Sequence, residues 1–235
     1  MRTSLGKIGL FIYARMDSRR LYGKALMPFG DRTLLEHVID RTRSIDAASC
    51  ALLTSDRDVD EPLVHAALSS DLEVVRGSAE NLVKRTVTAI HSLQVDRFVR
   101  VNSDSPLFEP HLVNAALERC RSEPLVSNLV DRRFPYGVAV EIVDASLYLQ
   151  SAGDAAPEEL EHVTKHLYRP PHNSIVMSLS QRDNFSHIRL AIDTQEDYVR
   201  VQGLFQQHAD AAAPYWELLG LPAPALRWDR LPPIH

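Results

Sequence analysis

Hydrophobic and polar positions along this chain repeat with two periods. Short apolar runs recur, and the first, residues 7–14, is β-branched and aromatic at its centre, as a buried strand would be. Between the runs lie segments with helical spacing: residues 33–43 place their apolar side chains on one helical face, and Thr33 with Glu36 has capping-box spacing. The expected strands are residues 7–14, 50–54, 72–76, 97–102, 125–128, 138–143, 175–179 and 187–192. The expected helices are residues 33–43, 62–68, 81–93, 110–121, 158–168 and 195–208.

Strands that alternate with helices at this spacing predict a mostly parallel sheet with helices on both faces. We therefore expect an α/β fold of three layers with a mixed sheet, formed by residues 1–235 as a single domain. After residue 124 the rhythm changes, and residues 130–186 are expected to form a small excursion that includes the strand 175–179. From Pro214 we expect a short helical piece and then poorly defined chain around Trp228.

Composition narrows the class of protein. The chain has 235 residues and a formal net charge of −5, which argues against a non-specific nucleic-acid binder. Cys50 and Cys120 are expected to be reduced residues in or near the core. The first apolar run is short and leads straight into Arg15 and Asp17, unlike a signal peptide. Since no run approaches transmembrane length, we expect a soluble, cytoplasmic protein with no membrane partner.

The stretch that follows the first strand is strongly basic. Arg15, Arg20 and Lys24 lie within residues 14–24, between a strand and the next helix. Such a loop can hold a polyphosphate, because backbone N–H groups point inward and the cations neutralise phosphate oxygens. Basic loop residues are often only solvated, and Arg19 keeps that interpretation. Ligands of parallel sheets bind beyond the carboxyl ends of the strands, where this loop lies.

Two aspartates also close strands. Asp104 follows the strand 97–102, and Asp193 follows the strand 187–192. Each could be a ligand at the sheet edge or only a helix N-cap, since Pro106 and Gln195 come soon after them. Asp197 is interpreted as an exposed charge on a helix.

Residues 14–24 resemble the nucleotide loop of the sugar-acid cytidylyltransferases. Among these enzymes the spore-coat polysaccharide biosynthesis family is the most similar, and the 3-deoxy-manno-octulosonate and acylneuraminate cytidylyltransferases are more distant. Further matching blocks follow in the same order at residues 34–39, 99–107, 126–128, 136–141, 161–164 and 191–197. Each block alone is weak, and the order of the set makes the resemblance specific.

This resemblance implies a nucleotide-diphospho-sugar transferase-like fold and a reaction. The reaction is Mg²⁺-dependent transfer of CMP from CTP to an acidic sugar or related small acceptor, with release of pyrophosphate. A homodimer is also implied, with the excursion at 130–186 forming the dimer contact and part of the acceptor pocket. The implied catalytic residues are Arg15, Lys24 and Asp104, and the implied metal ligands are Asp104 and Asp193. The implied nucleotide-binding residues are Ala14, Arg15, Ser18, Arg20, Lys24, Gly77, Ser78 and Asn102. The implied acceptor-binding residues are Arg133, Tyr136, Glu141 and His162.

Four positions depart from the family's pattern. Asp17 and Ser103 stand where glycine is usual, Tyr22 replaces a proline, and Ala139 replaces an aspartate. Asp17 adds a negative charge near the expected phosphates. These departures leave a second hypothesis open, a nucleotide-binding paralogue that no longer transfers and has a binding or regulatory role.

The acceptor side also keeps simpler interpretations. Glu141 could face solvent on an edge strand, and Tyr136 could be a packing residue. An anionic acceptor could be bound by three basic residues, Arg132, Arg133 and Lys165. They could equally be loop charges near an interface. His162 lies on a helical pattern, where a histidine is usually a packed or surface residue.

Overall fold

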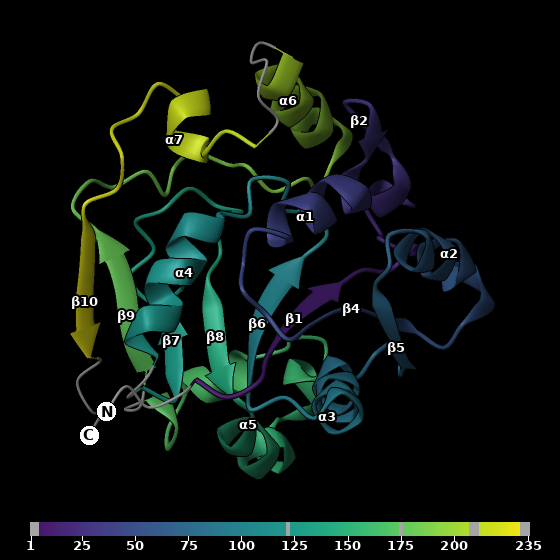
Figure 1. Cartoon of the computed structure of the whole chain (residues 1–235), viewed down its shortest axis with the longest axis vertical. Helices are drawn as coiled ribbons and strands as arrows, with labels where there is room; N and C mark the ends of the chain where they lie inside the picture. Colours follow the sequence, from purple (N-terminus) through teal and green to yellow (C-terminus); the bar gives the residue numbers. More distant parts are fainter. Residues whose placement is uncertain (1–4, 121–122, 174–175, 207–211, 231–235) are drawn as a thin grey trace.

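One mixed sheet organises the molecule. The structure is a computed structural model that describes residues 5–120, 123–173, 176–206 and 212–230. The sheet strands are β1 (Ile8–Tyr13), β4 (Ser49–Ser55), β5 (Glu73–Gly77), β6 (Arg97–Asn102), β7 (Leu125–Ser127), β8 (Glu141–Asp144), β9 (Val176–Gln181) and β10 (Leu226–Arg230). They lie in the order β10-β9-β7-β8-β6-β1-β4-β5 (Figure 1). Within this sheet β8 and β10 pair antiparallel with their neighbours and the other pairs are parallel, which confirms the predicted mixed, mostly parallel sheet.

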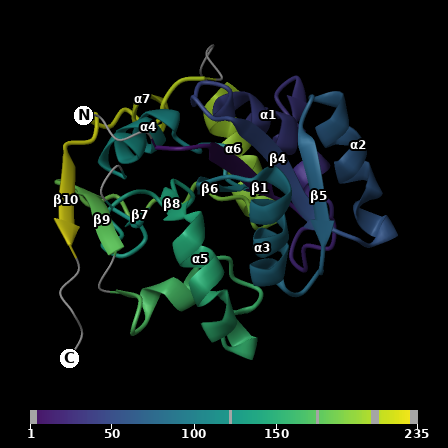
Figure 2. The same cartoon turned by 60° about the horizontal axis from the view of Figure 1, so that its bottom comes forward.

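Helices cover both faces of the sheet. They are α1 (Leu34–Thr42), α2 (Glu61–Ser69), α3 (Leu82–Leu93), α4 (Pro110–Arg119), α5 (Ala145–Ser151), α6 (Gln195–Gln206) and α7 (Tyr215–Leu218). A small hairpin of β2 (Pro28–Phe29) and β3 (Arg32–Thr33) precedes α1. α3 and α5 lie on one face, and α1, α2 and α4 lie on the other (Figure 2). The predicted three-layer α/β/α fold is therefore confirmed.

The central strand shows why the sequence folds this way. All six residues of β1 are buried, because helices cover both sides of it. Leu10 and Ile12 pack into the core beneath α1, α2 and α4, whereas Phe11 and Tyr13 pack into the core beneath α3 and α5. Burying each such side chain stabilises the fold by roughly 1.5–3 kcal/mol. The strand thus fixes both cores and delivers the basic loop to the edge of the sheet.

Local signals set where the helices begin. The capping box at α1 is confirmed: the Thr33 hydroxyl oxygen accepts from the Glu36 N–H at 3.2 Å, and the Glu36 carboxylate accepts from the Thr33 N–H at 2.8 Å. The Thr33 hydroxyl also donates to this carboxylate at 2.7 Å, and the hydrogen bonds from the Thr33 N–H and hydroxyl lower the pKa of Glu36. Asn81 caps α3 by accepting from the Lys84 N–H at 2.7 Å.

Two predicted elements are wrong. Residues 158–168 form two short 3₁₀ helices, Pro157–Glu159 and Lys165–Tyr168, in place of one α-helix. The carbonyl groups that a helix would use have distant partners, since Leu160 O accepts from the Leu82 N–H and Val163 O accepts from the Tyr148 hydroxyl. This places His162 in a turn.

Residues 187–192 do not form the predicted strand, since the segment contains a turn at residue 187 and a bend at residue 191. Their backbone pairs with two different loops: the N–H groups of Leu190 and Ala191 both donate to Tyr136 O, and the Ile192 N–H donates to Asp104 O. A single bridge joins Tyr136 and Arg189. The segment therefore crosses the carboxyl ends of the strands, which brings Asp193 beside Asp104.

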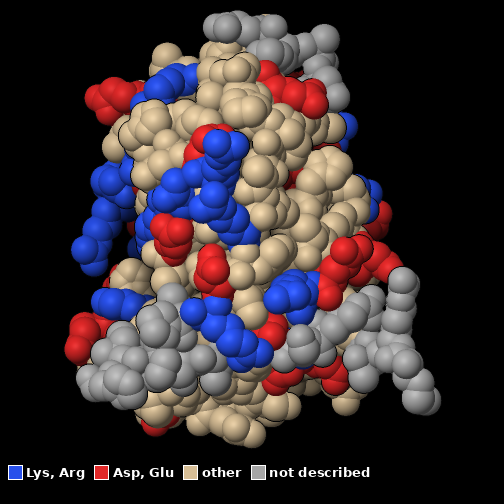
Figure 3. Space-filling model, turned by 90° about the vertical axis from the view of Figure 1, so that its left-hand side faces the viewer, with Lys and Arg blue, Asp and Glu red and all other residues tan. Residues whose placement is uncertain are grey.

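The C-terminal half contributes more to the main sheet than predicted. The strand expected at 175–179 belongs to this sheet as β9, parallel to β7, and residue 175 itself lies outside the described residues. Trp228 lies in β10, opposite Leu179, and not in poorly defined chain. Basic and acidic side chains are mixed on the side of the molecule that β10 borders (Figure 3), and charged residues on an edge strand discourage pairing with other chains.

The state of the cysteines and the character of the helices also follow from the structure. Cys50 and Cys120 are both free, as predicted, and Cys120 is buried. Within the described ranges, the helices lack the length and the apolar character that crossing a membrane requires.

Candidate active site

A large cleft opens at the carboxyl ends of β1 and β6. Its volume is about 1170 Å³. Its walls come from the basic loop, from the residues that follow β6, and from parts of residues 128–139 and 161–168. Parallel α/β sheets bind ligands at this edge, and the cleft is large enough for a nucleotide and a second small molecule.

Hydrogen bonds fix the conformation of the basic loop, residues 14–24. Gly23 has φ 67°, a left-handed conformation that suits glycine, and its N–H donates to Met16 O at 2.8 Å. The Met16 N–H donates to an oxygen of Asp60 at 2.7 Å. Asp60 is fully buried and also accepts from Ser55. The loop is therefore fixed at its start by Asp60 and closed by Gly23.

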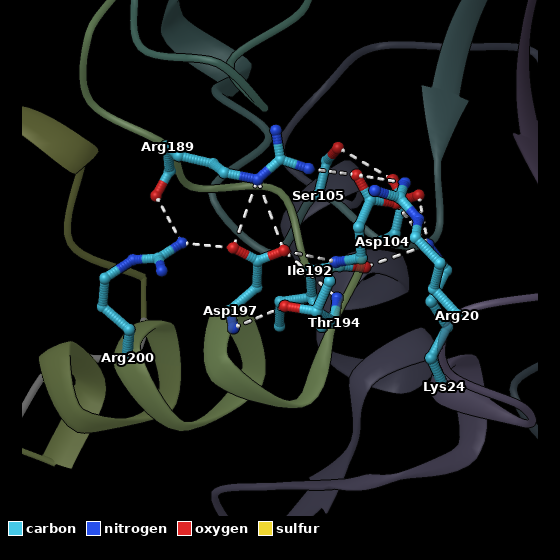
Figure 4. Close-up of polar contacts among 10 residues, drawn as sticks. Arg20, Lys24, Asp104, Ser105, Arg189, Ile192, Thr194, Asp197 and Arg200 are labelled. Carbon is cyan, nitrogen blue, oxygen red and sulfur yellow. Dashed lines mark hydrogen bonds and ion pairs between the residues drawn. The ribbon is translucent and has the colours of Figure 1, made fainter.

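Lys24 joins the two predicted metal aspartates. Its ammonium group donates to Asp104 Oδ2 at 2.7 Å, to Asp193 Oδ1 at 3.0 Å and to Ile192 O at 2.9 Å (Figure 4). The Lys24 side chain is 11% exposed, and those of Asp104 and Asp193 are 25% and 12% exposed. Asp104 and Asp193, which are far apart in the sequence, thus meet at the Lys24 ammonium group in the cleft.

Further contacts orient these two carboxylates. Asp193 Oδ2 pairs with Arg20 Nη2 at 3.0 Å and also accepts from Arg189. Asp104 Oδ1 accepts from the Ser105 hydroxyl at 3.2 Å. Neither aspartate caps a helix in this structure. Glu109 caps α4, and the capping interactions at α6 are those of Thr194 and Asp197.

Asp197 is not the exposed charge that we expected. It is 4% exposed, and its Oδ2 accepts from the N–H groups of Asp193 and Thr194, each at 3.1 Å. Its Oδ1 accepts from Arg200 at 2.6 Å and from Arg189 Nε at 3.2 Å. Burial alone would raise the pKa of Asp197, but hydrogen bonds from Arg200, the Asp193 amide and Arg189 outweigh it and hold the pKa well below its usual value.

Most of the predicted nucleotide-binding residues lie together. The cleft is lined by Ala14, Arg15, Ser18, Arg20, Lys24 and Asn102. Gly77 and Ser78 instead line a second, smaller hollow of about 420 Å³. Arg85 borders both hollows and donates to Ser78 O at 3.2 Å through Nε, so the two lie on opposite sides of one side chain.

The charge of Asp17 is already paired. Its carboxylate lies 2.8 Å from Arg57 Nη2 and 3.6 Å from Arg15 Nε. Among the described residues, Asp71 and Gln94 are the non-glycine residues with positive φ, so Asp17 does not need the conformation that glycine favours. Arg57 therefore offsets part of the repulsion that Asp17 would exert on a phosphate.

The predicted acceptor residues divide into two groups. Tyr136 and His162 line the cleft, and Tyr136 is 44% exposed. Arg133 is not among the lining residues: its guanidinium donates to Gln181 O at 2.7 Å and to Arg182 O at 2.6 Å. The neighbouring Arg132 does line the cleft, as does Lys165.

Glu141 lies beneath the cleft, and the expectation that it could face solvent is wrong. It is fully buried, pairs with Arg100, and accepts from the hydroxyls of Thr164 at 2.6 Å and Tyr168. Arg100, Thr164 and Tyr168 line the cleft directly. The Glu141 charge raises the pKa of Arg100 although burial opposes it. Glu141 thus fixes cleft walls from below.

Sequence reasoning missed Arg189. Its guanidinium lies 4.5 Å from the centre of the Tyr136 ring, a cation–π contact, while it also pairs with Asp193 and Asp197. The spacing Thr194-x-x-Asp197 is that of a capping box and could have placed Asp197. Nothing local in the sequence marks Arg189, because its partners come from a loop and a helix that only the fold brings together.

The donor chemistry suits a magnesium ion. Asp104 and Asp193 already share one cation, the Lys24 ammonium, so their oxygens are close enough to share another. In the described part of the chain no three His, Cys, Asp or Glu side chains gather as a metal site. Mg²⁺ often binds through one or two carboxylates and completes its shell with phosphate and water oxygens, so this pair fits it.

Comparisons with known proteins agree with this geometry. The model of the family described as cytidylyltransferase matches residues 10–217. The spore coat polysaccharide biosynthesis protein SpsF of Bacillus subtilis is 29% identical over 212 residues, which cover 86% of this chain and 88% of SpsF. A cytidylyltransferase structure from Leptospira borgpetersenii has a TM-score of 0.86 at 27% identity and covers 92% of this chain and 93% of that one.

A structure of CMP:2-keto-3-deoxy-manno-octonic acid synthetase complexed with CTP is also similar in fold. Its TM-score is 0.62 at 18% identity, covering 86% of this chain and 99% of that one. The fold and the resemblance that the sequence motifs predicted are confirmed by these similarities.

Proposed function

This chain belongs to the cytidylyltransferase family and is a CTP-using nucleotidyltransferase, and we propose that it transfers CMP from CTP to an acidic sugar with the help of Mg²⁺. In this reaction an acceptor hydroxyl oxygen forms a bond to the α-phosphorus of CTP. The bond from that phosphorus to the bridging oxygen breaks, pyrophosphate leaves, and the hydroxyl proton passes to solvent or to a phosphate oxygen.

One observation carries the proposal: Lys24 holds Asp104 and Asp193 together at the edge of the cleft, next to Arg20. Cations and carboxylates in contact at one point form a site that can exchange partners when a polyphosphate and its metal enter. A surface of solvated charges would not be built around a lysine with an 11% exposed side chain.

The residues of the basic loop would bind the triphosphate. Arg15 and Arg20 line the cleft and can form charge-assisted hydrogen bonds with phosphate oxygens. Lys24 would stabilise the negative charge that develops on the leaving pyrophosphate, because its position is fixed before the substrate arrives. These donors would act mainly by electrostatic stabilisation and by positioning, which dominate phosphoryl-group chemistry.

Asp104 and Asp193 would hold Mg²⁺, and their negative charges would attract it. When bound, this ion neutralises phosphate oxygens and lowers the pKa of the acceptor hydroxyl. We propose that Ser18 and Asn102 complete the nucleotide site. Asn102 is held in place because its Oδ1 accepts from Arg100 Nη1 at 3.0 Å.

We propose that the Gly77–Ser78 segment approaches the cytosine base. Arg85 supports this, because it lines both the main cleft and the smaller hollow beside that segment and donates to Ser78 O.

The acceptor would occupy the part of the cleft between Tyr136 and residues 161–165. Tyr136 and His162 line this part, and the charges of Arg132 and Lys165 suit an anionic acceptor. Arg133 and Glu141 would contribute indirectly, because their polar groups are occupied by Gln181, Arg182 and Arg100.

The assay is pyrophosphate release from CTP with acidic sugar acceptors, 3-deoxy-manno-octulosonate and an N-acylneuraminate, and with a neutral hexose for comparison. We expect release with an acidic acceptor, none with the hexose, and complete loss when EDTA removes the metal. Asp104→Asn should lower turnover by at least about 10³-fold, as loss of a major electrostatic group does. Asp46→Asn is the matched control, because Asp46 is exposed at the opposite edge of the sheet, before β4.

The alternative is a nucleotide-binding paralogue without transferase activity, suggested by Asp17, Ser103 and Ala139. CTP binding that depends on Asp104, without pyrophosphate release from CTP in the presence of any acidic sugar, would favour it. The pairing of Asp17 with Arg57 supports the transferase instead, since Asp17 does not stand as an isolated charge beside the phosphates.

Assembly and location are part of the same proposal. We propose a homodimer that uses surface within residues 130–186, and a cytoplasmic protein, since CTP is a cytoplasmic substrate. Both rest on the family resemblance. Sedimentation equilibrium tests the first, where a mass of one chain would contradict it.

A further inference from the structure

Beside the metal aspartate lies a buried carboxylate with no assigned role. We propose that Asp197 is a positioning residue that keeps Asp193 directed toward the cleft, both through the backbone and by restraining Arg189. This inference rests on the proposed function of Asp193 as a metal ligand.

The Asp197 carboxylate makes two sets of contacts. Oδ2 accepts from the N–H groups of Asp193 and Thr194, each at 3.1 Å, and so fixes the backbone from which the Asp193 side chain projects. Oδ1 accepts from Arg200 at 2.6 Å, and Arg189 Nε donates to Oδ1 at 3.2 Å and to Oδ2 at 3.3 Å (Figure 4). A helix cap needs only the first set of contacts.

Arg189 is the group that Asp197 restrains. Its guanidinium pairs with Asp193 Oδ2, stacks over the Tyr136 ring at 4.5 Å and pairs with Asp197. Its carbonyl oxygen accepts from Arg200 at 3.2 Å, so the backbone of residue 189 is also held. Arg189 therefore touches Asp193 with one nitrogen only, while its Nε faces Asp197.

This arrangement decides how much of Asp193 is available. Asp193 Oδ1 bonds to Lys24 on the side of the cleft, and Oδ2 contacts Arg189 and Arg20. Without the negative charge of Asp197, Arg189 could turn both nitrogens to Asp193 and form a bidentate pair, which is the favoured arginine–carboxylate geometry. A bidentate pair would withdraw the carboxylate from Lys24 and from an incoming metal. Partners that orient a metal ligand typically change metal affinity by 10–100-fold.

A purely structural role makes a different prediction, and the chain offers a matched control. The Thr194 hydroxyl accepts from the Asp197 N–H at 3.2 Å, which is the other half of the same capping interaction. Thr194→Ala removes this cap but leaves Asp197, Arg189 and Asp193 in contact. If Asp197 only caps α6, then Asp197→Asn and Thr194→Ala should have the same consequences.

The experiment measures Mn²⁺ binding by electron paramagnetic resonance at saturating CTP, together with the thermal midpoint of each variant. We expect Asp197→Asn to weaken Mn²⁺ binding about 10–100-fold, and Thr194→Ala to lower the thermal midpoint while Mn²⁺ affinity stays within about twofold. Glu196→Gln, a change of an exposed neighbour, controls for net charge. Asp197→Glu keeps the charge and the cap but shifts the carboxylate, so we expect a several-fold loss with a wild-type midpoint. This variant decides the question if Asp197→Asn does not fold.

Two results would overturn the inference: Mn²⁺ affinity unchanged in both Asp197 variants, or an equal loss in Thr194→Ala. If wild type binds Mn²⁺ with CTP in either case, the proposed function stands and only the role of Asp197 falls. If wild type itself binds no Mn²⁺ with CTP, the proposed metal site falls and this inference falls with it.

Discussion

Two acidic centres border the same cleft, and their surroundings differ. Beside the basic loop, Asp104 and Asp193 share Lys24 and remain partly open to the cleft. Beneath the wall that Arg100, Thr164 and Tyr168 form, Glu141 is fully buried and is satisfied by that arginine and the two hydroxyl groups. Both centres pair a carboxylate with a cation that lines the cleft, but only in the first is the carboxylate itself open to an entering ligand.

This difference separates carboxylates that can exchange a protein partner for a ligand from carboxylates that only support the wall of the cleft. A partly open ion pair in a cleft loses little stability when one partner changes, because water can replace the lost contact. A fully buried pair cannot lose one partner cheaply, since the other charge is left without solvent. The exposure of the carboxylate thus separates the carboxylates that a ligand can reach from those that only support the cleft.

The largest expected effect is on activity at the open centre, which consists of Asp104, Asp193 and Lys24. Asp193→Asn should lower turnover by about 10³-fold, since it removes charge where we propose that the metal and phosphates bind. Its free energy of unfolding should change by less than about 1 kcal/mol, because Lys24 keeps its contact with Asp104 and the side chains of Arg20 and Arg189 are 60% and 38% exposed. Turnover and urea denaturation of one preparation test both parts. A loss of several kcal/mol in stability would show that the open centre is structural after all.

At the buried centre we expect the opposite result. Glu141→Gln takes the carboxylate partner away from Arg100, whose side chain is only 15% exposed, and should lower the free energy of unfolding by roughly 3–5 kcal/mol. Glu118→Gln, an exposed change on α4, is the control and should cost little. A Glu141→Gln protein as stable as wild type would contradict the assignment of Glu141 to the support of the cleft.

A smaller effect is expected from one hydroxyl of the same centre. The Tyr168 hydroxyl contacts Glu141 and lies 2.6 Å from the Ser127 hydroxyl oxygen. Tyr168→Phe removes one hydrogen bond to a buried charge and should cost about 1–2 kcal/mol of stability. Urea titration measures this difference. A cost equal to that of Glu141→Gln would mean that the hydroxyl, and not the arginine, holds the carboxylate.

The most gradual effect concerns pH and comes from two buried histidines, His37 and His166. Burial lowers the pKa of His37, which contacts Pro106 O at 3.0 Å, to about 4, and burial also lowers the pKa of His166 to about 4. The unfolded chain binds protons at these histidines near the ordinary pKa of about 6.5. Between these values the unfolded state therefore holds more protons, and stability should fall as pH falls from about 6.5 to 4.

Urea titrations at pH 7.5, 6 and 5 test this, with His37→Gln as the variant that removes part of the dependence. If stability is constant across these values in wild type, the two histidines are not held neutral.

Much of the fold follows from patterns that act locally. The buried run that became β1 and the capping box at Thr33 and Glu36 were both predicted, because neighbouring residues alone determine them. Residues 187–192 were predicted wrongly, since an apolar run shows burial but not which backbone groups will pair with it. The segment pairs with Tyr136 and Asp104, which are distant in sequence.

The site residues also divide into those that local motifs predicted and those that only the fold brings together. Lys24, Asp104 and Asp193 belong to motifs and were placed together by the rule that ligands bind at strand ends. The burial of Glu141 could not be predicted from the sequence. Its partners Thr164 and Tyr168 lie in a segment that was expected to be one helix, and nothing in that segment indicated that their hydroxyl groups would donate to Glu141. Asp197 looked like a surface charge because Arg189 and Arg200 reach it only in the folded chain.

The proposed nucleotide–metal site is tested most directly by calorimetric titration of wild type and Asp104→Asn with each of the four ribonucleoside triphosphates, with and without Mg²⁺. We predict that wild type binds CTP in preference to the others, more tightly with Mg²⁺, and that Asp104→Asn loses the Mg²⁺ dependence. If no triphosphate binds to wild type, or if Asp104→Asn responds to Mg²⁺ as wild type does, then the open centre is not the nucleotide–metal site.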